Sequence, residues 1–444
     1  MRVFTLLGLC VVLTASCSGD DTSPASGAGT QTGTQGGAGG TSATATGGGG
    51  TSETGGSGGT AGIETGGSSG SAGSGGGENP DSGSAGAPPT DGGVIPEPGP
   101  ASQEPFDWGK AVADTRIAAR GFGAGYVDGL ALHGIYLLYK RLKDPKYLNT
   151  VVGAARGYAG DSVGSLDSVM HMTTLNNAYE AMQDGAFKTG ADRTRRHFDN
   201  YPKTDGVFWH SPSKTQQLWG DGVFMSLSFL SRYGTVFHDT STYPMMVTNL
   251  VNTAKHLRNP DTGLLWHAYD GTGGGFAIPP SNTNKISWGR AMGWFVMASV
   301  MSLEALPADA PGRADVEKTL RDLVIALAKY QDAKTGLWFQ VVDRGTDAEN
   351  WLETSCSSMY SYGIWWAYKH QLVDATYAAV AKKGLRGIID LKLTKDANNR
   401  TTIKTICEGL NASTDLVGTY YHHGVSDNDP HGIGAFLLMW EGMQ

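Results

Sequence analysis

Cysteine is scarce in this chain, with four residues in 444. Two of the four, Cys10 and Cys17, stand at the very beginning, so Cys356 and Cys407 are the only cysteines in the part that we expect to fold. At most one disulfide can form there. An exported protein meets conditions in which this pair can oxidise, but two free buried thiols fit the sequence equally well.

Motifs that bind metals or nucleotides are also missing. The sequence contains neither an HExxH motif nor a Cys/His cluster with ligand spacing, and the pair His422-His423 stands alone. No glycine-rich loop follows a predicted strand, because most of the glycines belong to a low-complexity segment. The sequence therefore indicates neither a bound metal ion nor a nucleotide cofactor.

Positively charged residues are fewer than negatively charged ones. The chain has 34 Lys and Arg against 42 Asp and Glu, a net charge of −8. No stretch gathers Lys and Arg densely enough to form the basic surface of a nucleic-acid-binding protein. We therefore expect no nucleic acid among its partners.

Aromatic residues are absent from Gly19 to Ala101, a stretch composed almost entirely of Gly, Ser, Thr, Ala, Pro and acidic residues. Such a segment cannot bury enough surface to offset the entropy lost on ordering. We predict a disordered Gly/Ser-rich tether over residues 18–101. The remaining residues, 102–444, contain all the tryptophans and have enough apolar side chains for one large catalytic domain.

Long hydrophobic runs are limited to the N-terminus. Arg2 precedes the apolar run Val3 to Leu13, and small residues follow up to Cys17, which predicts a signal peptide over residues 1–17. Cys17 occupies the position of a lipidated bacterial cysteine, although Thr14 replaces the usual large apolar residue. We expect a lipid-anchored envelope protein, with a freely secreted or periplasmic protein as the alternative. No later run is long enough to span a bilayer.

A short phrase recurs three times, as Lys203–His210, Asp261–His267 and Lys334–Gln340. Each copy ends a helical stretch at a turn and then presents an aromatic residue with a polar neighbour. The spacing of the copies suits two helices plus their loops. The phrase therefore predicts repeated helical hairpins whose loops build one pocket.

Helices of two kinds alternate along the folded part. Asp315 to Tyr330 has a one-sided apolar stripe, as do Tyr243 to Leu257 and Tyr377 to Leu391, whereas Ala291 to Met301 and Phe224 to Leu230 are apolar nearly all round. This pattern predicts an outer and an inner ring of helices. We predict an all-α, six-hairpin α/α toroid, with an open helical solenoid as the alternative, and place the site where the ends of the inner helices converge.

Asp221 is the candidate catalytic residue. It lies between Gly220 and Gly222 at the start of a predicted inner helix, beside Trp219. A carboxyl group against an aromatic wall has its charged form disfavoured and can act as a general acid, whereas the helix N-terminus stabilises the carboxylate. A simple N-cap role is the structural alternative.

The candidate binding residues occupy comparable positions in other repeats. Arg290, between Trp288 and Trp294, has the paired donors that recognise a planar carboxylate, and the two tryptophans offer apolar faces to a sugar. A bridge from Arg290 to a neighbouring acid is the alternative. His210 and His267 follow the aromatic residues of the first two phrases.

Asp167 opens an earlier predicted helix as a second pocket carboxylate, again with N-capping as the alternative. The segments that start at Trp351 and Ser426 should complete the rim of the pocket.

Seven motifs in order resemble the unsaturated rhamnogalacturonyl hydrolase family: FWH, QLWGDGVFM, GLLWHAYD, SWGRAMGWFV, GLWFQVVDR, NWLETSCSSMY and DPHGIGAFLL. The resemblance implies removal of a terminal 4,5-unsaturated galacturonyl residue from lyase-generated pectin fragments, without a cofactor. It implies that Asp221 protonates C4 of the vinyl ether and helps water to add at C5. It also implies substrate contacts for the aspartate, histidines, arginine and tryptophans named above: Asp167, His210, His267, Trp288, Arg290 and Trp294.

The chain departs from the family pattern on the substrate side. Ala291-Met292 replaces the usual Gly-Asn after the arginine, and Ser211 to Ser213 replaces basic residues. The end sugar and its neighbour are therefore open, and an unsaturated glucuronyl hydrolase is the nearest alternative. The sequence is also compatible with a surface carbohydrate-binding protein that lacks catalysis and with a glycosidase that acts on saturated glycans.

Overall fold

The computed structural model describes residues 98–444, so the predicted signal peptide, the lipid-anchor site at Cys17 and almost all of the predicted tether lie outside the described residues. The folded part begins with a 3-10 turn, η1 (Pro100–Gln103). Ala101 in this turn is buried, and its N–H donates to the carbonyl of Met443 at 3.0 Å. The folded part therefore starts slightly before the predicted boundary at 102, because residues 100 and 101 pack beside the C-terminal helix.

Twelve α-helices in the described part of the chain alternate between an outer and an inner position. The outer helices are α1 (Trp108–Ala119), α3 (Pro145–Tyr158), α5 (Gly185–His197), α7 (Tyr243–Leu257), α9 (Arg313–Ala328) and α11 (Ala375–Lys392). The inner helices are α2 (Tyr126–Leu142), α4 (Thr173–Met182), α6 (Gly220–Phe237), α8 (Gly289–Ala305), α10 (Thr354–Lys369) and α12 (Pro430–Gly442). One outer and one inner helix make each of six hairpins.

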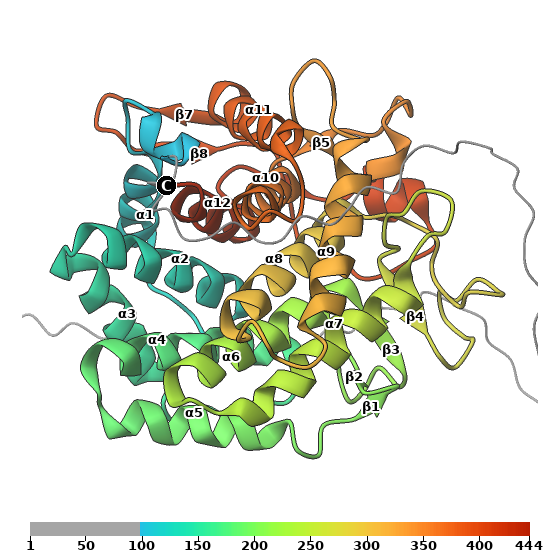
Figure 1. The fold of residues 1–444 in the computed structure, drawn as a ribbon. Coiled ribbons are helices and arrows are strands. Elements are labelled where there is room, and N and C mark those ends of the chain that lie inside the picture. Colours follow the sequence, from blue (N-terminus) through green and yellow to red (C-terminus); the bar gives the residue numbers. More distant parts are fainter. Residues whose placement is uncertain (1–97) are drawn as a thin grey trace, which may run out of the picture. The chain divides into compact units, whose positions relative to one another are not determined.

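The inner helices form a closed ring. Each packs on the next along the chain, and α12 packs on α2 to close the circle. In Figure 1 the colours run around this ring, from α1 in blue through green and yellow to α12 in dark red, which lies beside α1 and α2. The predicted six-hairpin toroid is confirmed, and the alternative of an open solenoid is wrong because the two ends of the helical series are in contact.

Burial explains the two kinds of helix. Almost every residue of α8 is buried, since α6, α9 and α10 cover it on different sides. In α9 only a stripe is buried, including Val316, Leu320 and Leu327, and the charged residues face outward. The hydrophobic pattern of each helix therefore determines whether it is stable inside the ring or only on its outer surface.

The three repeated phrases form the turns that lead from an outer helix back to an inner one. Gly206, Gly263 and Gly336 have φ values of 77°, 76° and 78°, in the left-handed region that favours glycine. These turns follow α5, α7 and α9, and the chain then returns through extended residues to α6, α8 and α10. The predicted role of the phrase as a hairpin turn is confirmed.

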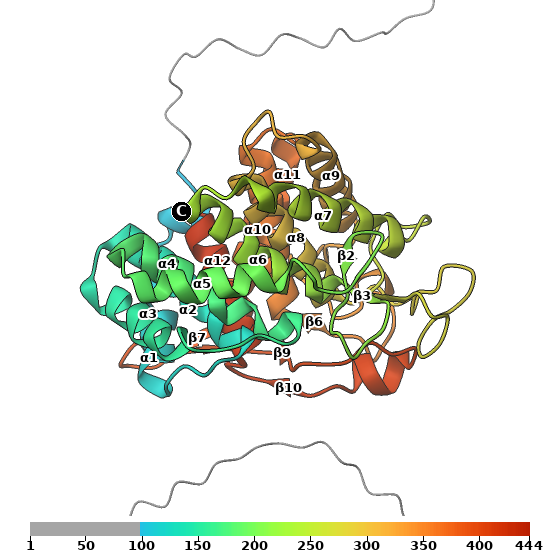
Figure 2. The ribbon, with the colours of Figure 1, turned by 90° about the horizontal axis from the view of Figure 1, so that it is seen from below.

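Short antiparallel strand pairs join the loops at one end of the ring. They are β1 (Lys203–Thr204) with β2 (Val207–Phe208), β3 (Gln217–Trp219) with β4 (Ala268–Asp270), β5 (Trp338–Phe339) with β6 (Leu352–Glu353), β7 (Leu393–Lys395) with β8 (Thr401–Ile403), and β9 (Ile406–Cys407) with β10 (Val425–Ser426). Figure 2 shows β6, β9 and β10 at this end.

The loops also hold the starts of the inner helices. The N–H of Gly220, the first residue of α6, donates to the carbonyl of His267 in the next loop, and Gly289 at the start of α8 donates to Gln340. Thr354 at the start of α10 donates to Thr405 in the same way. The N-termini of neighbouring inner helices are thereby brought to one end of the toroid.

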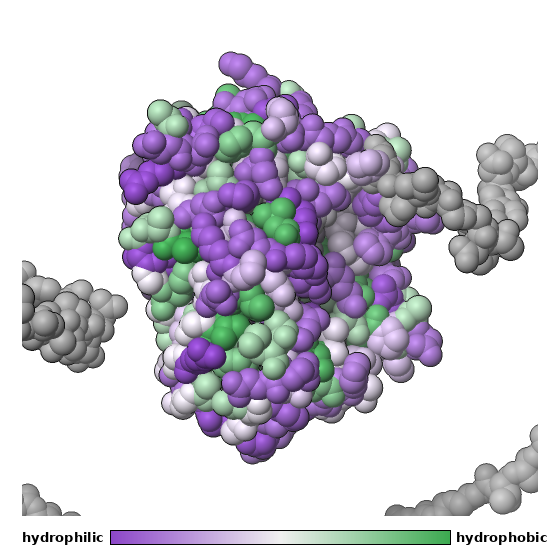
Figure 3. All heavy atoms as spheres, turned by 90° about the vertical axis from the view of Figure 1, so that its left-hand side faces the viewer, coloured by the Kyte–Doolittle hydropathy of each residue, from purple (hydrophilic) through white to green (hydrophobic). Residues whose placement is uncertain are grey.

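The outer surface has no large apolar area on the face shown in Figure 3, where hydrophobic residues form small patches among hydrophilic ones. Among residues 98–444, four large hydrophobic side chains are exposed: Met182, Leu391, Val417 and Val425. None of the described helices is long and apolar enough to cross a membrane.

Candidate active site

A pocket of about 170 Å³ opens where the N-termini of the inner helices meet the loops. Its lining residues are Tyr126, Asp167, His210, Trp219, Asp221, Met225, Gly409, Leu410 and Asn411. The volume lies below the roughly 300–1,000 Å³ of pockets for drug-sized ligands, so the ligand that fits is small. Three predicted site residues, Asp167, His210 and Asp221, lie together in this pocket.

Asp221 is the second residue of α6, and Trp219 holds the N-cap position without a side-chain capping bond. The alternative of an N-cap aspartate is therefore excluded. Gly220 is sterically required, because a Cβ there would come 2.9 Å from the Ala291 carbonyl oxygen, whereas a Cβ on Gly222 would come 2.9 Å from Leu166 Cδ1, a side-chain end that can shift. Gly220 allows α6 to begin against its neighbours with Asp221 at the pocket wall.

The carboxylate of Asp221 retains an unbonded oxygen. Its Oδ2 lies 3.2 Å from Nε2 of His267, close enough for an ion pair. The two atoms are not aligned as a hydrogen bond, and within the described residues neither forms one elsewhere. A buried carboxyl oxygen without a hydrogen bond is unusual. Because Oδ2 is buried against His267, a ligand in the pocket meets the remaining part of the Asp221 side chain, of which 13% is exposed.

The pKa of Asp221 results from opposing effects. Burial raises it, whereas the contact with His267 and the positive charges of His267, His210 and Arg290 lower it. The lowering effects win, so the pKa lies below the usual aspartate value. The expected effect of the aromatic wall is present, but the neighbouring cationic groups outweigh it in the unliganded protein.

The two predicted histidines lie on either side of Trp219. His210 stacks on the indole, with ring centroids 4.2 Å apart and an interplanar angle of 7°, and its Nε2 lies 3.5 Å from Asp167 Oδ2. His267 is fully buried between Trp219 and Trp288, and its Nδ1 lies 2.8 Å from the Tyr420 hydroxyl. His210 therefore faces the pocket, whereas His267 supports Asp221 from behind.

Asp167 lies in a 3-10 turn, η2 (Leu166–Ser168), which a capping box between Ser165 and Ser168 closes. The prediction that it opens a long helix is wrong in detail, because α4 begins only at Thr173. Ser165 takes the N-cap position of the turn, which leaves the Asp167 carboxylate half-exposed at the pocket.

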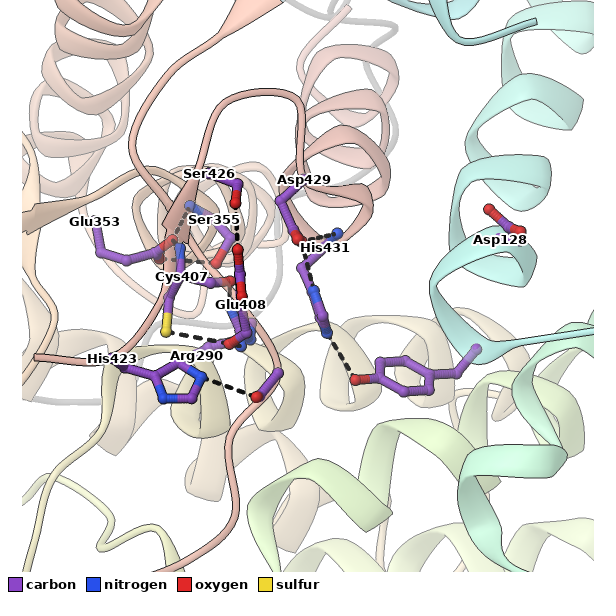
Figure 4. Close-up of polar contacts among 12 residues, drawn as sticks. Asp128, Arg290, Glu353, Ser355, Cys407, Glu408, His423, Ser426, Asp429 and His431 are labelled. Atoms are coloured by element: carbon purple, nitrogen blue, oxygen red, sulfur yellow. Dashed lines mark hydrogen bonds and ion pairs between the residues drawn. The ribbon is translucent and has the colours of Figure 1, made fainter. Parts of the chain in front are cut away.

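Arg290, the second residue of α8, makes its paired hydrogen bonds to the main chain. Its Nη1 donates to the Cys407 carbonyl and its Nη2 to the Glu408 carbonyl, each at 2.5 Å, and only 1% of the residue is exposed. In Figure 4 the side chain points toward Cys407 and Glu408. Arg290 is therefore not exposed in the pocket. The alternative prediction, an ion pair with a neighbouring acidic residue, is not found either, because the guanidinium bonds to main-chain carbonyls. Arg290 holds the segment 407–411, which forms one wall of the pocket.

Trp288 and Trp294 are each 1% exposed, so neither presents an open face to the pocket. The guanidinium of Arg290 lies 4.6 Å from the Trp288 ring centroid, and Trp294 stacks on Phe224 at 5.0 Å. Both tryptophans therefore pack inside the ring. The indole that lines the pocket is Trp219, which the sequence had placed beside Asp221 as an aromatic wall and not among the substrate-binding residues.

A second polar chain reaches the pocket from α12. Oδ1 of Asp429 lies 2.6 Å from Nδ1 of His431, and Nε2 of His431 lies 2.6 Å from the hydroxyl of Tyr126. Figure 4 shows Asp429 and His431 side by side. The segment from Ser426 was expected to complete the rim, but nothing in the sequence around Tyr126 indicated a site residue.

The protonation states of His431 and Tyr126 determine whether the Tyr126 hydroxyl donates or accepts a hydrogen bond in the pocket. Burial lowers the pKa of His431, with the charge of Arg290 adding to the effect, so the imidazole is neutral. Burial also raises the pKa of Tyr126, which keeps its proton. If Nδ1 donates to Asp429, then Nε2 accepts from Tyr126. The Tyr126 oxygen then presents acceptor lone pairs to the pocket.

Glu353 anchors the same pocket wall that Arg290 holds. The fully buried carboxylate accepts from the N–H groups of Ser355 at 3.0 Å, Cys356 at 2.6 Å and Cys407 at 3.1 Å. It therefore caps α10 and positions β9 together. Cys356 and Cys407 are buried free thiols, and burial raises the pKa of Cys407 to about 11.

Comparisons of sequence place the chain among carbohydrate-active enzymes. Residues 109–443 match the model of glycosyl hydrolase family 88. The unsaturated rhamnogalacturonyl hydrolase YesR of Bacillus subtilis (strain 168) is 23% identical over 278 residues, 61% of this chain and 76% of the relative. Protein Atu3128 of Agrobacterium fabrum is 28% identical over 231 residues, 49% of this chain and 97% of the relative.

Solved structures show the same architecture. A family 105 glycoside hydrolase from C. acetobutylicum ATCC 824 has a TM-score of 0.72 and 28% identity, covering 76% of this chain and 99% of that one. An unsaturated glucuronyl hydrolase from Bacillus sp. GL1 has a TM-score of 0.58 and 12% identity, covering 75% and 93%, a likeness of fold alone. Because the family model spans well over half of the chain, this protein belongs to glycosyl hydrolase family 88 and is a six-hairpin glycosidase.

Proposed function

We propose that the protein removes the terminal 4,5-unsaturated galacturonyl residue from oligosaccharides that a lyase has released from rhamnogalacturonan. The observation that carries the proposal is the partly exposed carboxyl group of Asp221, which lines a small pocket while His267 holds one of its oxygens from behind. Family membership supports hydrolysis of a glycoside. The printed name of the Bacillus subtilis relative supports the substrate class.

The reaction is the addition of one water molecule across the C4–C5 double bond. Asp221 donates its proton to C4, and positive charge develops at C5 and the ring oxygen. The Asp221 carboxylate then accepts a proton from the water molecule whose oxygen bonds to C5, which restores the acid. The product is a hemiketal, which opens to a keto-uronate and releases the neighbouring sugar.

The substrate itself can prepare Asp221 for the first step. In the free protein, positive groups keep the pKa of Asp221 low. A uronate carboxylate that enters the pocket brings a negative charge and displaces water, and both effects raise the pKa of a neighbouring carboxyl group. Asp221 therefore gains a proton when the ligand that needs it is bound.

Other residues in and around the pocket are suited to binding the substrate. The charge of Arg290 contributes to lowering the pKa of Asp221, and in this proposal the same charge attracts the uronate without direct contact. His210 has a buried Nδ1 with no hydrogen-bond partner among the described residues, and Asn411 lies at the opening of the pocket. The polar side chains that line the pocket and that a uronate or a sugar hydroxyl would meet are those of Tyr126, Asp167, His210, Asp221 and Asn411.

The test is the loss of absorbance of the conjugated double bond when the protein is mixed with lyase-generated rhamnogalacturonan fragments. Asp221→Asn should lower the rate by at least about a hundredfold, the usual size of a general-acid contribution. Asp309→Asn, on an exposed loop, is the matched control and should keep full activity. Circular dichroism should show the same helical content in both variants.

A panel of unsaturated disaccharides then separates the competing functions. Faster turnover of an unsaturated glucuronyl substrate would assign the protein to glucuronyl ends instead. Binding of fragments without any change in absorbance would identify a non-catalytic carbohydrate-binding protein. Activity on untreated polysaccharide would point to a glycosidase of saturated glycans.

A further inference from the structure

A groove larger than the catalytic pocket lies elsewhere in the described part of the chain. It is a groove of about 810 Å³, against about 170 Å³ for the pocket that contains Asp221. Its lining comes from the end of α7, the turn of the second repeated phrase, and the loops around residues 280–285 and 343–344. A cavity of this size accommodates several sugar units or a drug-sized ligand.

The groove and the catalytic pocket share one segment of chain. Trp266 lines the groove, and the next residue, His267, supports Asp221. The backbone N–H of Trp266 donates to Leu257 and that of His267 to Ile286, each at 2.8 Å, so both residues are held in place. Successive side chains of an extended chain point to opposite faces, which explains how one segment serves both cavities.

Trp266 offers the features that bind a sugar. The residue is only partly buried, in contrast to Trp288 and Trp294. No residue in the range 98–444 accepts a hydrogen bond from its indole N–H, which is not buried. An indole combines a broad apolar face with one polar donor, so it can pack on a sugar ring and bond a hydroxyl or carboxylate.

Positive charge gathers around this indole. Four cationic residues line the groove, against two carboxylates, in a chain whose net charge is −8. The cationic residues are Lys255, Arg258, Lys285 and Arg344, and the carboxylates belong to Asp261 and Asp343. Lys285 and Arg344 are exposed, and within the described residues neither forms an ion pair. Lys285 and Arg344 both line the groove, and Arg344 interacts with the neighbouring Asp343 only beyond ion-pair distance.

Arg258 gives the strongest indication that the groove binds an anion. It is partly buried, and Nη1 donates to the Gly263 carbonyl at 2.7 Å, but no carboxylate in the described part of the chain lies within ion-pair distance. Burial lowers its pKa, and only a longer-range attraction to Asp322 opposes this. A cation that has lost part of its hydration and retains free donors gains most from an anionic ligand.

The two carboxylates of the groove offset only part of the charge of its four cations. Asp343 accepts a hydrogen bond from the Ser287 hydroxyl at 3.3 Å, and Asp261 is the exposed carboxylate of the groove. His256, which also lines the groove, is already paired with Asp205 at 2.9 Å. The cations that remain available, Arg258, Lys285 and Arg344, line the groove together with Trp266.

We propose that this groove is a second binding site for an anionic oligosaccharide, in which one sugar packs on Trp266 and its carboxylates meet Arg258, Lys285 and Arg344. A neutral glycan would leave the cations unused, and a polyanion without sugar rings would not use the indole face. The site goes beyond the proposed reaction. It holds acidic glycan chains at a surface separate from the pocket that processes their ends.

The experiment uses a saturated oligogalacturonide as the probe, because it lacks the double bond and is not turned over. Calorimetry with the full chain should show binding. The double substitution Lys285→Ala and Arg344→Ala should weaken the affinity by about tenfold, and Trp266→Ala should have a similar effect. Added salt should weaken binding to the unchanged protein more than to the double variant.

Two controls make the result specific. The fully methyl-esterified oligomer has the same sugars without charge and should bind at least about tenfold more weakly. Lys188→Ala, which removes an exposed lysine from α5, should leave the affinity unchanged. The Lys285→Ala and Arg344→Ala variant should also keep its kcat/KM on a short unsaturated disaccharide.

The proposal is overturned if the double variant binds the oligogalacturonide as well as the unchanged protein, or if the methyl ester binds equally well. It is also overturned if inorganic polyphosphate binds as tightly as the glycan and is equally affected by Trp266→Ala. The test measures binding of an oligogalacturonide that the protein does not turn over. Its result therefore stands even if the protein does not catalyse the proposed reaction.

Discussion

Oδ2 of Asp221 lies 3.2 Å from Nε2 of His267. The other imidazole nitrogen, Nδ1, is 2.8 Å from the hydroxyl of Tyr420, which also accepts a hydrogen bond from the Asn284 amide at 2.8 Å. Tyr420 is 153 residues from His267 in the sequence. A tyrosine from the loop between α11 and α12 therefore fixes the orientation of the imidazole that controls the proposed acid.

Replacing His267 should change the pH dependence of the reaction. His267→Gln removes a group that lowers the pKa of Asp221, so this pKa should rise. The limb of the kcat/KM profile that reports Asp221 should then move to higher pH, and kcat should fall because the carboxyl group is less firmly positioned. Tyr420→Phe should shift the profile in the same direction by less. An unchanged profile in His267→Gln would show that the contact does not influence the acid.

Arg290 should prove to be a positioning residue. Arg290→Lys cannot reproduce the two hydrogen bonds to the carbonyls of Cys407 and Glu408. We expect a loss of about 2–3 kcal/mol in the free energy of unfolding, the cost of leaving buried polar groups without partners. Urea denaturation measures this loss, and hydrogen exchange should show faster opening of residues 407–411. If Arg290 instead contacts substrate directly, KM should rise while stability and exchange stay the same.

Tyr126 and His431 should act as one unit. Tyr126→Phe removes the acceptor that faces the pocket, and His431→Gln removes the group that orients it. Each should raise KM by up to about tenfold, the value of one hydrogen bond, with a smaller change in kcat. The double variant should be no worse than the stronger single variant. Additive effects in this double-mutant cycle would show that the two residues act separately.

His133 should make the fold sensitive to acid. It is buried on α2, with Nδ1 3.0 Å from the Asn177 amide, and burial lowers its pKa to about 3. An unfolded histidine has a pKa near 6.5, so the neutral form stabilises the folded state above that pH. This stability is lost as the pH falls from 6.5 toward 3, by about 2 kcal/mol at pH 5.

The measurement compares urea denaturation at pH 7 and pH 5 for the unchanged protein and for His133→Gln. The variant is less stable at both pH values but should lose about 2 kcal/mol less on acidification. An equal loss in both proteins would mean that His133 does not titrate on unfolding.

The sequence predicted the architecture well because its signals are local. The apolar pattern of α8 differs from the stripe on α9 within each helix itself, and glycines such as Gly263 mark turns through their own backbone conformation. The position of Asp221 at the start of α6 followed from the same signals. Site prediction was weaker for Arg290 and Trp294, because residue type does not reveal which neighbours will cover a side chain.

The alternation of inner and outer helices, and the acidic and basic residues at the starts of the inner ones, can be read from local patterns in the chain. Which of these side chains face the pocket depends on how the helices pack together. Tyr126 and His431 meet across 305 residues because α12 closes the ring against α2, and Arg290 is covered because β9 crosses above it. Such contacts depend on closure of the whole ring, and no local pattern encodes them.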